Sequence, residues 1–245
     1  MNEFIFKVTK GHLIENISNY IDFEFHALRT FVKQTSDLYD DWEKQTIKTF
    51  KENESPEIDG QGNVPYMRRW LKNQLNTRDQ IGGIMLSSGF VSSVSLFEYF
   101  LKDICDIMID KSKITPDEID GESYIEKSKI FLTKVVGVDL SSDEEKWKIL
   151  FGYSEIRNKI VHNQSRIKKH KGKREKEQPP LYRKIKEMSG VIFDVQTESS
   201  AHFIITEPEF IYNYCTLAEE YLSLTIQKVW QRIKALGIED EEIEG

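Results

Sequence analysis

The residues best suited to chemistry lie in one short stretch of the chain, between Glu155 and Asn163. Its polar members include Arg157, His162, Asn158 and Asn163. A histidine titrates near neutral pH and can move a proton to or from a ribose hydroxyl or a leaving oxygen. An arginine stays charged and can stabilise a phosphorane-like transition state. Together these residues would suit RNA cleavage without a metal, in which the 2′-hydroxyl attacks its own phosphate.

Helical spacing determines the direction in which each of these side chains points from the helix axis. Each residue of a helix advances by about 100°, so two stripes lie roughly opposite each other. The stripe predicted to face the core contains Ile149, Tyr153, Ile156 and Ile160. The second stripe contains Trp147, Phe151, Asn158 and His162. Arg157 projects between the stripes and points about 140° away from His162. One helix therefore holds the groups apart, and two copies meeting across a homodimer interface would bring them together.

The spacing from Arg157 through Asn158 to His162 resembles the signature of HEPN domains, an arginine and a histidine separated by four to six residues with a polar residue after the arginine. The stretch from Ser92 to Leu101 also resembles the central helix of that family. The resemblance implies a metal-independent endoribonuclease of a bacterial toxin or anti-phage defence system. His162 would then be the general acid or base, Arg157 the transition-state stabiliser and Asn158 the orienting group.

The same resemblance bears on control of the activity. A toxin or defence nuclease would need restraint by an antitoxin or another regulatory protein. Some toxin members carry a tyrosine two positions after the histidine, where a partner enzyme modifies it. This chain has Gln164 there, so control by modification of that position is not expected.

Other polar residues would support the site. Glu98 lies on the most apolar helix, where a buried carboxylate needs a cation or hydrogen-bond donors. It either orients Arg157 or pairs with a different cation, and Asn163 is a second supporting residue. A basic run either remains solvated or guides RNA phosphates; it contains Lys168, Lys169, Lys171, Lys173 and Arg174. The histidines and cysteines show no spacing typical of a metal site, so neither a metal nor a cofactor is expected.

The apolar pattern predicts an all-α bundle of four to six helices with a small β-hairpin before the last helix. The first helix is long, from Leu13 to Phe50, and Pro65 begins a second. Further helices are expected at 84–109, 124–136, in the motif region after Ser142, and at 208–236. The hairpin pairs the runs 191–195 and 202–205. We expect a single domain over 1–245, with a mobile basic loop at 164–180 and an acidic tail at 238–245.

Composition limits the partners and the location. The net charge of −7 and a sequence pI near 5.4 give no overall attraction to nucleic acid, so RNA binding would need a local basic patch. No signal peptide is recognisable, and no apolar run approaches the roughly 20 residues of a membrane span. Cys105 and Cys215 lie in apolar contexts and are expected to be buried thiols. These features predict a cytoplasmic protein that does not associate with membranes.

Two non-enzymatic interpretations of the same residues remain open. Arg157 and His162 can form a satisfied polar patch within a helical bundle, because polar clusters are often structural. Alternatively, the chain can be a non-catalytic HEPN-like interaction module that binds a protein or nucleotide through the same helix face.

Overall fold

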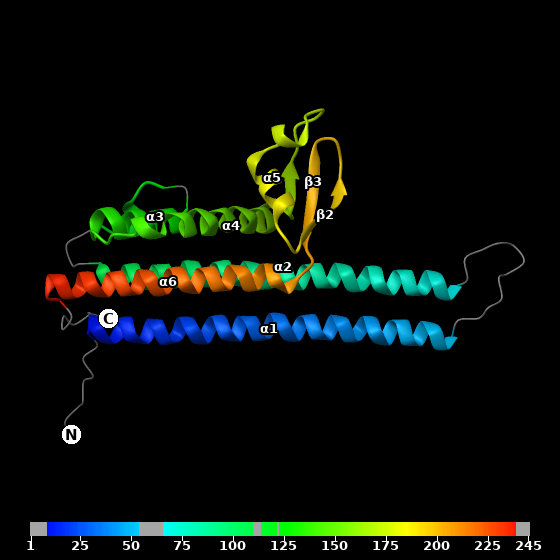
Figure 1. Cartoon of the computed structure of the whole chain (residues 1–245), viewed down its shortest axis with the longest axis horizontal. Coiled ribbons are helices and arrows are strands. Elements are labelled where there is room, and N and C mark those ends of the chain that lie inside the picture. The colour runs from blue at the N-terminus through cyan, green and yellow to red at the C-terminus, as the bar shows by residue number, and fades with distance from the viewer. Residues whose placement is uncertain (1–8, 54–65, 110–113, 122, 239–245) are drawn as a thin grey trace, which may run out of the picture. The chain divides into compact units, whose positions relative to one another are not determined.

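The chain is mostly helical, as the sequence predicts. The computed structural model describes residues 9–53, 66–109, 114–121 and 123–238. The helices of this part of the chain are α1 (Lys10–Asn53), α2 (Tyr66–Met108), α3 (Tyr124–Ile130), α4 (Glu144–Asn163), α5 (Pro180–Glu187) and α6 (Pro208–Leu236) (Figure 1). The strands are β1 (Arg166–Lys168), β2 (Val191–Gln196) and β3 (Ser200–Ile205). The predicted helical bundle, with its long N-terminal helix and small sheet before the last helix, is confirmed.

Short irregular helices complete these elements. Turns of 3-10 helix lie at η1 (Pro116–Glu118), η3 (Ser141–Asp143) and η4 (Glu175–Glu177), and a π-helical segment, η2 (Phe131–Val135), continues α3. The predicted helix start at Pro65 lies outside the described residues, and so does most of the predicted acidic tail.

The chain forms two compact units, each assembled from separate segments. Unit 1 comprises Met1–Ala27, Ser92–Asn158 and Asn213–Gly245, and unit 2 comprises Leu28–Val91 and Lys159–Tyr212. Helices α1, α2, α4 and α6 therefore each contribute residues to both units. The single-domain organisation stays a prediction.

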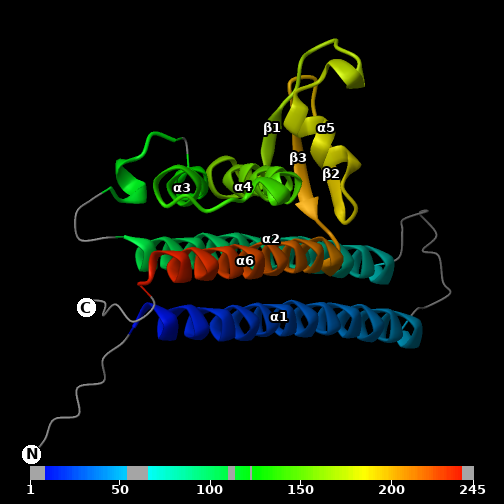
Figure 2. The same ribbon diagram turned by 60° about the vertical axis from the view of Figure 1, so that its left-hand side comes forward.

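The core of unit 1 is built around the C-terminal part of α2. Val94, Phe97 and Ile104 of this helix have no exposed surface. The Phe97 ring lies 6.1 Å from the ring of Tyr221 on α6, measured between centroids, and α6 runs beside this part of α2 in both views (Figures 1 and 2). Cys105 and Cys215 are thiols buried in the same core. A helix that is apolar on most of its faces thus lies at the centre of the unit.

Helix α2 continues without a break through Gly82 and Gly83, so the predicted helix start near Ile84 is wrong. Glycine inside a helix costs only about 1 kcal/mol relative to alanine, and packing of the helix outweighs that cost. Gly89, one of the glycines of unit 2, also permits close packing. A Cβ atom placed there would lie 3.1 Å from Cγ2 of Val32 on α1.

By length and composition alone, α2 could also cross a membrane. Among the described residues one span passes this test, Arg68–Met108, with a hydropathy of 1.4 over its most apolar window. This span differs from the expectation that no apolar run approaches the length of a membrane span. However, 44% of that window is buried within the protein, and the core helix of a soluble protein passes the same test.

The sheet belongs entirely to unit 2 and contains one strand more than the predicted hairpin. Its strand order is β1-β3-β2, and both pairings are antiparallel. The hairpin of β2 and β3 is confirmed, whereas β1 lies within the segment predicted to be a loop. Helix α5 packs against the sheet in both views (Figures 1 and 2), and its Tyr182 ring stacks on Phe193 of β2 with centroids 4.8 Å apart.

Two glycines of α2 provide a test of its packing. Gly82→Ala should raise the free energy of unfolding by about 0.5–1 kcal/mol, because a Cβ there meets Tyr39 only at 3.9 Å. Gly89→Leu should lower it by about 1–3 kcal/mol, because its side chain would overlap Val32. Urea denaturation of both variants measures the difference. Equal effects of the two substitutions would contradict this packing.

Candidate functional site

Helix α4 packs its buried face against α6 and α2 within unit 1. Trp147 is 7% exposed, and its ring centroid lies 5.6 Å from that of Tyr221 on α6. Ile149 is 45% exposed. The prediction that Ile149 belongs to the core-facing stripe is therefore wrong, because the second stripe, with Trp147, is the buried one at the start of the helix. The indole is the larger apolar surface, and its burial against Tyr221 sets the rotation of the helix.

Side-chain hydrogen bonds hold the residues at the start of α4. The Ser141 amide and hydroxyl both donate hydrogen bonds to Asp139, at 3.0 and 2.6 Å. The Ser142 hydroxyl donates to Asp143 at 2.7 Å, and Lys228 of α6 donates to both of these side chains. A lysine from another helix thus holds the beginning of α4 in place.

Arg157 lies next to the buried side of α4, and its side chain points toward α2 within unit 1. Its Nη2 lies 3.9 Å from Oε2 of Glu98, and the two side chains are 23% and 28% exposed. Its Nη1 donates a hydrogen bond to Oδ1 of the exposed Asn158 at 3.1 Å. The buried Nε of Arg157 has no hydrogen-bond partner among the described residues. Of the two alternatives for Glu98, contact with Arg157 is the one that the structure contains.

Two opposing effects act on the pKa of the Glu98 carboxyl, and burial is the larger of the two. Burial raises the pKa of the Glu98 carboxyl, because a carboxylate loses hydration when it leaves water, and the Arg157 guanidinium lowers it again. The aromatic pair of Tyr153 and Tyr214, with centroids 5.1 Å apart, packs α4 against α6 in the same unit. The arginine is therefore held in a partly dry environment, where its charge acts more strongly than in water.

His162 and Asn163 end α4 and belong to unit 2. Both side chains are exposed. Gln164 and Ser165 follow with φ angles of 50° and 58°, a left-handed conformation that is uncommon for residues other than glycine. The amide of Ser165 donates to the carbonyl of Lys159 at 2.9 Å, and its own carbonyl accepts from the amide of Phe203 on β3 at 3.1 Å. Ser165 thus joins the end of the histidine helix to the sheet.

The basic residues are all at or near the surface of unit 2, and some already have partners. Lys168 lies on β1 opposite Ser200. Lys169 donates to the Gln196 side chain at 3.2 Å and lies 5.7 Å from the Tyr182 ring centroid. Ion pairs join Lys171 to Glu198 at 2.7 Å and Lys173 to Glu177 at 4.0 Å, while Arg174 is exposed.

The predicted site residues thus fall into two groups on either side of the division between the units. Arg157, Asn158 and Glu98 come together in unit 1, and His162 and Asn163 lie in unit 2 with the basic residues. Within the part of the chain that the structure describes, no group of three or more His, Cys, Asp or Glu residues could hold a metal ion. Comparison of the chain with protein-family models, curated proteins and solved structures finds no match.

Removal of Arg157 should make stability depend on pH through Glu98. In Arg157→Leu the folded-state pKa of Glu98 rises further, while its pKa in the unfolded chain is unchanged. Below the unfolded pKa the carboxyl is neutral in both states, and above it the folded variant must ionise an unpaired, partly buried group. We expect the destabilisation to be about 1 kcal/mol larger near pH 7 than near pH 3.5, after allowing for solvent screening.

Urea denaturation at the two pH values measures this difference. Arg157→Lys is the matched control, because it keeps a cation beside Glu98 and should show a smaller dependence on pH. Equal destabilisation of Arg157→Leu at both pH values would show that the ion pair is not coupled to folding.

Proposed function

We propose that the chain is a metal-independent endoribonuclease of the HEPN type, acting in the cytoplasm as a toxin or anti-phage defence effector. The proposal rests first on the motif of Arg157, Asn158 and His162. The observation that carries it furthest is the support of Arg157 from two sides, by Glu98 and Asn158. A fixed guanidinium in a partly buried position is what stabilisation of a pentacoordinate phosphate requires.

The proposed reaction divides the work between two charged side chains. His162 takes the proton from the ribose 2′-hydroxyl or gives one to the departing 5′-oxygen. The 2′-oxygen forms its bond to phosphorus as the bond to the 5′-oxygen breaks, leaving a cyclic phosphate. Arg157 stabilises the negative charge that develops on the non-bridging oxygens.

Substrate binding is proposed to use the basic residues that follow His162. The segment from Arg166 to Lys176 contains seven lysines and arginines and one acid, although the whole chain carries a net charge of −7. Strand β1 fixes the beginning of this segment in the sheet. Such a local excess of positive charge attracts the phosphates of RNA without any contact to bases.

A homodimer completes the proposed site. Arg157 and His162 are five residues apart, so helical geometry directs them about 140° from each other on one chain. A two-fold interface through α4 would place the arginine of one protomer near the histidine of its partner. A regulatory protein such as an antitoxin would restrain the assembled site.

Loss of His162 should abolish cleavage without affecting the fold. With a single-stranded RNA and excess EDTA, we expect His162→Ala to cleave at least about 100-fold more slowly than the wild type, because the proton transfer is lost. His12→Ala, which removes an exposed histidine from α1, is the matched control and should retain full activity. Cleavage by His162→Ala at the wild-type rate, or cleavage by the wild type that EDTA abolishes, would contradict the proposal.

Mixing two inactive variants tests the shared site. If one protomer supplies Arg157 and its partner His162, a heterodimer of Arg157→Ala and His162→Ala contains one intact site. Random exchange of protomers should then restore about one quarter of the wild-type rate. The rate is measured after the two proteins have been unfolded and refolded together. The control is a mixture of the two variants that were refolded separately. If the co-refolded sample recovers no activity, a site that combines Arg157 of one protomer with His162 of its partner is ruled out.

The second candidate function is a non-catalytic module that binds a protein or nucleotide partner through the same helix face. The burial of the Arg157 Nε favours it, because a buried donor is not accessible to a phosphate. Equal behaviour of the wild type and His162→Ala toward RNA would support this function over the nuclease.

A further inference from the structure

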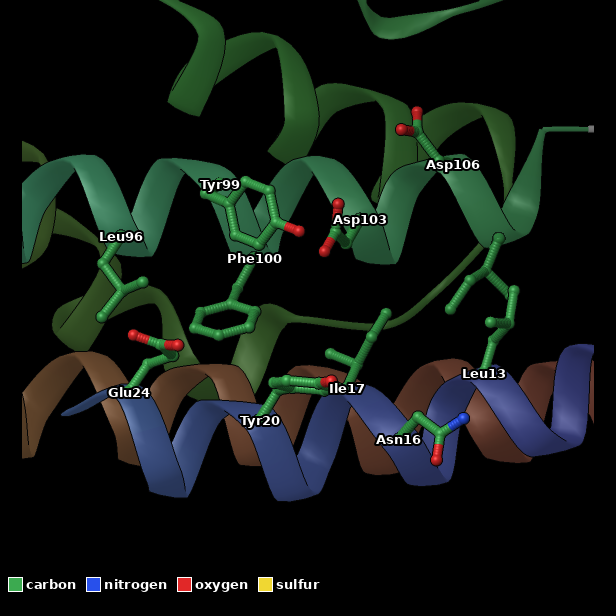
Figure 3. Close-up of a pocket in the computed structure, with 11 residues that line it drawn as sticks. Leu13, Asn16, Ile17, Tyr20, Glu24, Leu96, Tyr99, Phe100, Asp103 and Asp106 are labelled. Atoms are coloured by element: carbon green, nitrogen blue, oxygen red, sulfur yellow. The ribbon is translucent and has the colours of Figure 1, made fainter. Parts of the chain in front are cut away.

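A groove lies within unit 1, between the first turns of α1 and the last turns of α2 (Figure 3). Its volume is about 570 Å³, which lies within the range of small-molecule binding sites. Apolar side chains from both helices, including Ile17 and Phe100, form its inner surface. Its two walls come from segments far apart in the chain, so the groove cannot be recognised in the sequence alone.

The charged side chains that line the groove are all acidic. Glu24, Asp103 and Asp106 line it, and none of the residues described as lining it is a lysine or an arginine. Burial raises the pKa of both Asp103 and Asp106, and the smaller opposing effect of Lys102 does not cancel this rise. Repulsion by Asp106 also raises the pKa of Asp103, and repulsion by Asp117 raises the pKa of Asp106. Partly dehydrated carboxylates that repel one another favour the binding of a cation.

Two tyrosines add surfaces that suit a cation with an apolar body. Tyr20 is 61% exposed and Tyr99 is 56% exposed, although both are large aromatic residues. The Tyr99 hydroxyl donates a hydrogen bond to the Asp103 carboxylate, which fixes both side chains on the same wall. The face of an aromatic ring attracts ammonium groups and also contacts methylene groups favourably.

The acidic groups are spaced along the groove rather than gathered at one point. Figure 3 shows Glu24 on α1 opposite Leu96, with Tyr20 and Tyr99 further along and Asp103 beyond them. Leu96 and Asp103 are seven residues apart on α2, or about 10 Å along the helix axis, and Asp106 lies about 4.5 Å beyond Asp103. Acidic groups thus alternate with aromatic or aliphatic surface over the length of the groove.

We propose that this groove binds a linear aliphatic polyamine, with ammonium groups at Glu24 and Asp103 and the methylene chain over Tyr20 and Tyr99. A polyamine carries positive charges separated by apolar segments, and so matches the alternation of the groove. A compact inorganic cation matches it less well, because such an ion needs several oxygen ligands at one point and makes no use of apolar surface. This site is separate from the residues of the proposed nuclease and does not depend on that activity.

Calorimetric titration of the purified full-length chain with spermidine, without RNA and at low salt, tests the proposal. We expect saturable binding to one site. Glu24→Gln and Asp103→Asn should each weaken binding by about 5- to 10-fold, because each removes one charge contact. Tyr20→Ala should also weaken it, whereas Tyr20→Phe should not, since the ring is retained.

The controls separate this site from general attraction to an acidic protein. Asp41→Asn removes an exposed acid of α1 outside the groove and should leave the affinity unchanged. An equal concentration of MgCl2 should not displace spermidine. The proposal is overturned if spermidine does not bind, if Glu24→Gln/Asp103→Asn binds it like the wild type, or if Mg²⁺ competes equally. It is also overturned if a lysine-rich peptide occupies the groove and spermidine does not.

Discussion

Burial of α2 on most of its sides is the constraint on which the other features depend. Phe90, Val94, Phe97 and Ile104 have no exposed surface, and burial of each such side chain contributes about 1.5–3 kcal/mol. The remaining helices must therefore cover α2 in each unit. Any acidic residue on α2 therefore either needs a partner or must lie where the neighbouring helices leave α2 exposed. Glu98 is an example of the first case and Asp103 of the second, so one constraint accounts for both the candidate site and the groove.

Periodicity was sufficient to predict most of the helices, because apolar residues recur at helical spacing over long stretches. It did not predict that α2 is continuous. Gly82 and Gly83 resemble a helix boundary in the sequence, yet two glycines cost less than the packing that a continuous helix gains. Strand β1 was missed for a different reason. Its lysine-rich sequence resembles a loop, and its strand conformation depends on pairing with β3, which follows much later in the chain.

The candidate site was predictable in its residue types but not in its orientation. Helical geometry placed Asn158 and His162 on one side of α4, and both are exposed. The rotation of the helix depends on Trp147, whose burial against Tyr221 of α6 cannot be read from the α4 sequence alone. That rotation turns Arg157 toward Glu98. A contact between two helices decides which polar residues face solvent, and a pattern within one helix does not contain that information.

The positions of the two cysteines have a practical consequence. Cys105 and Cys215 are both buried in unit 1, and the chain has no others. Burial raises the pKa of the Cys105 thiol to about 12, so the reactive thiolate is scarce at neutral pH while the core is closed. A thiol-specific reagent will label the native chain only when unit 1 opens. The rate of labelling therefore reports the local opening of one half of the molecule, without any engineered probe, and carries no signal from the other half.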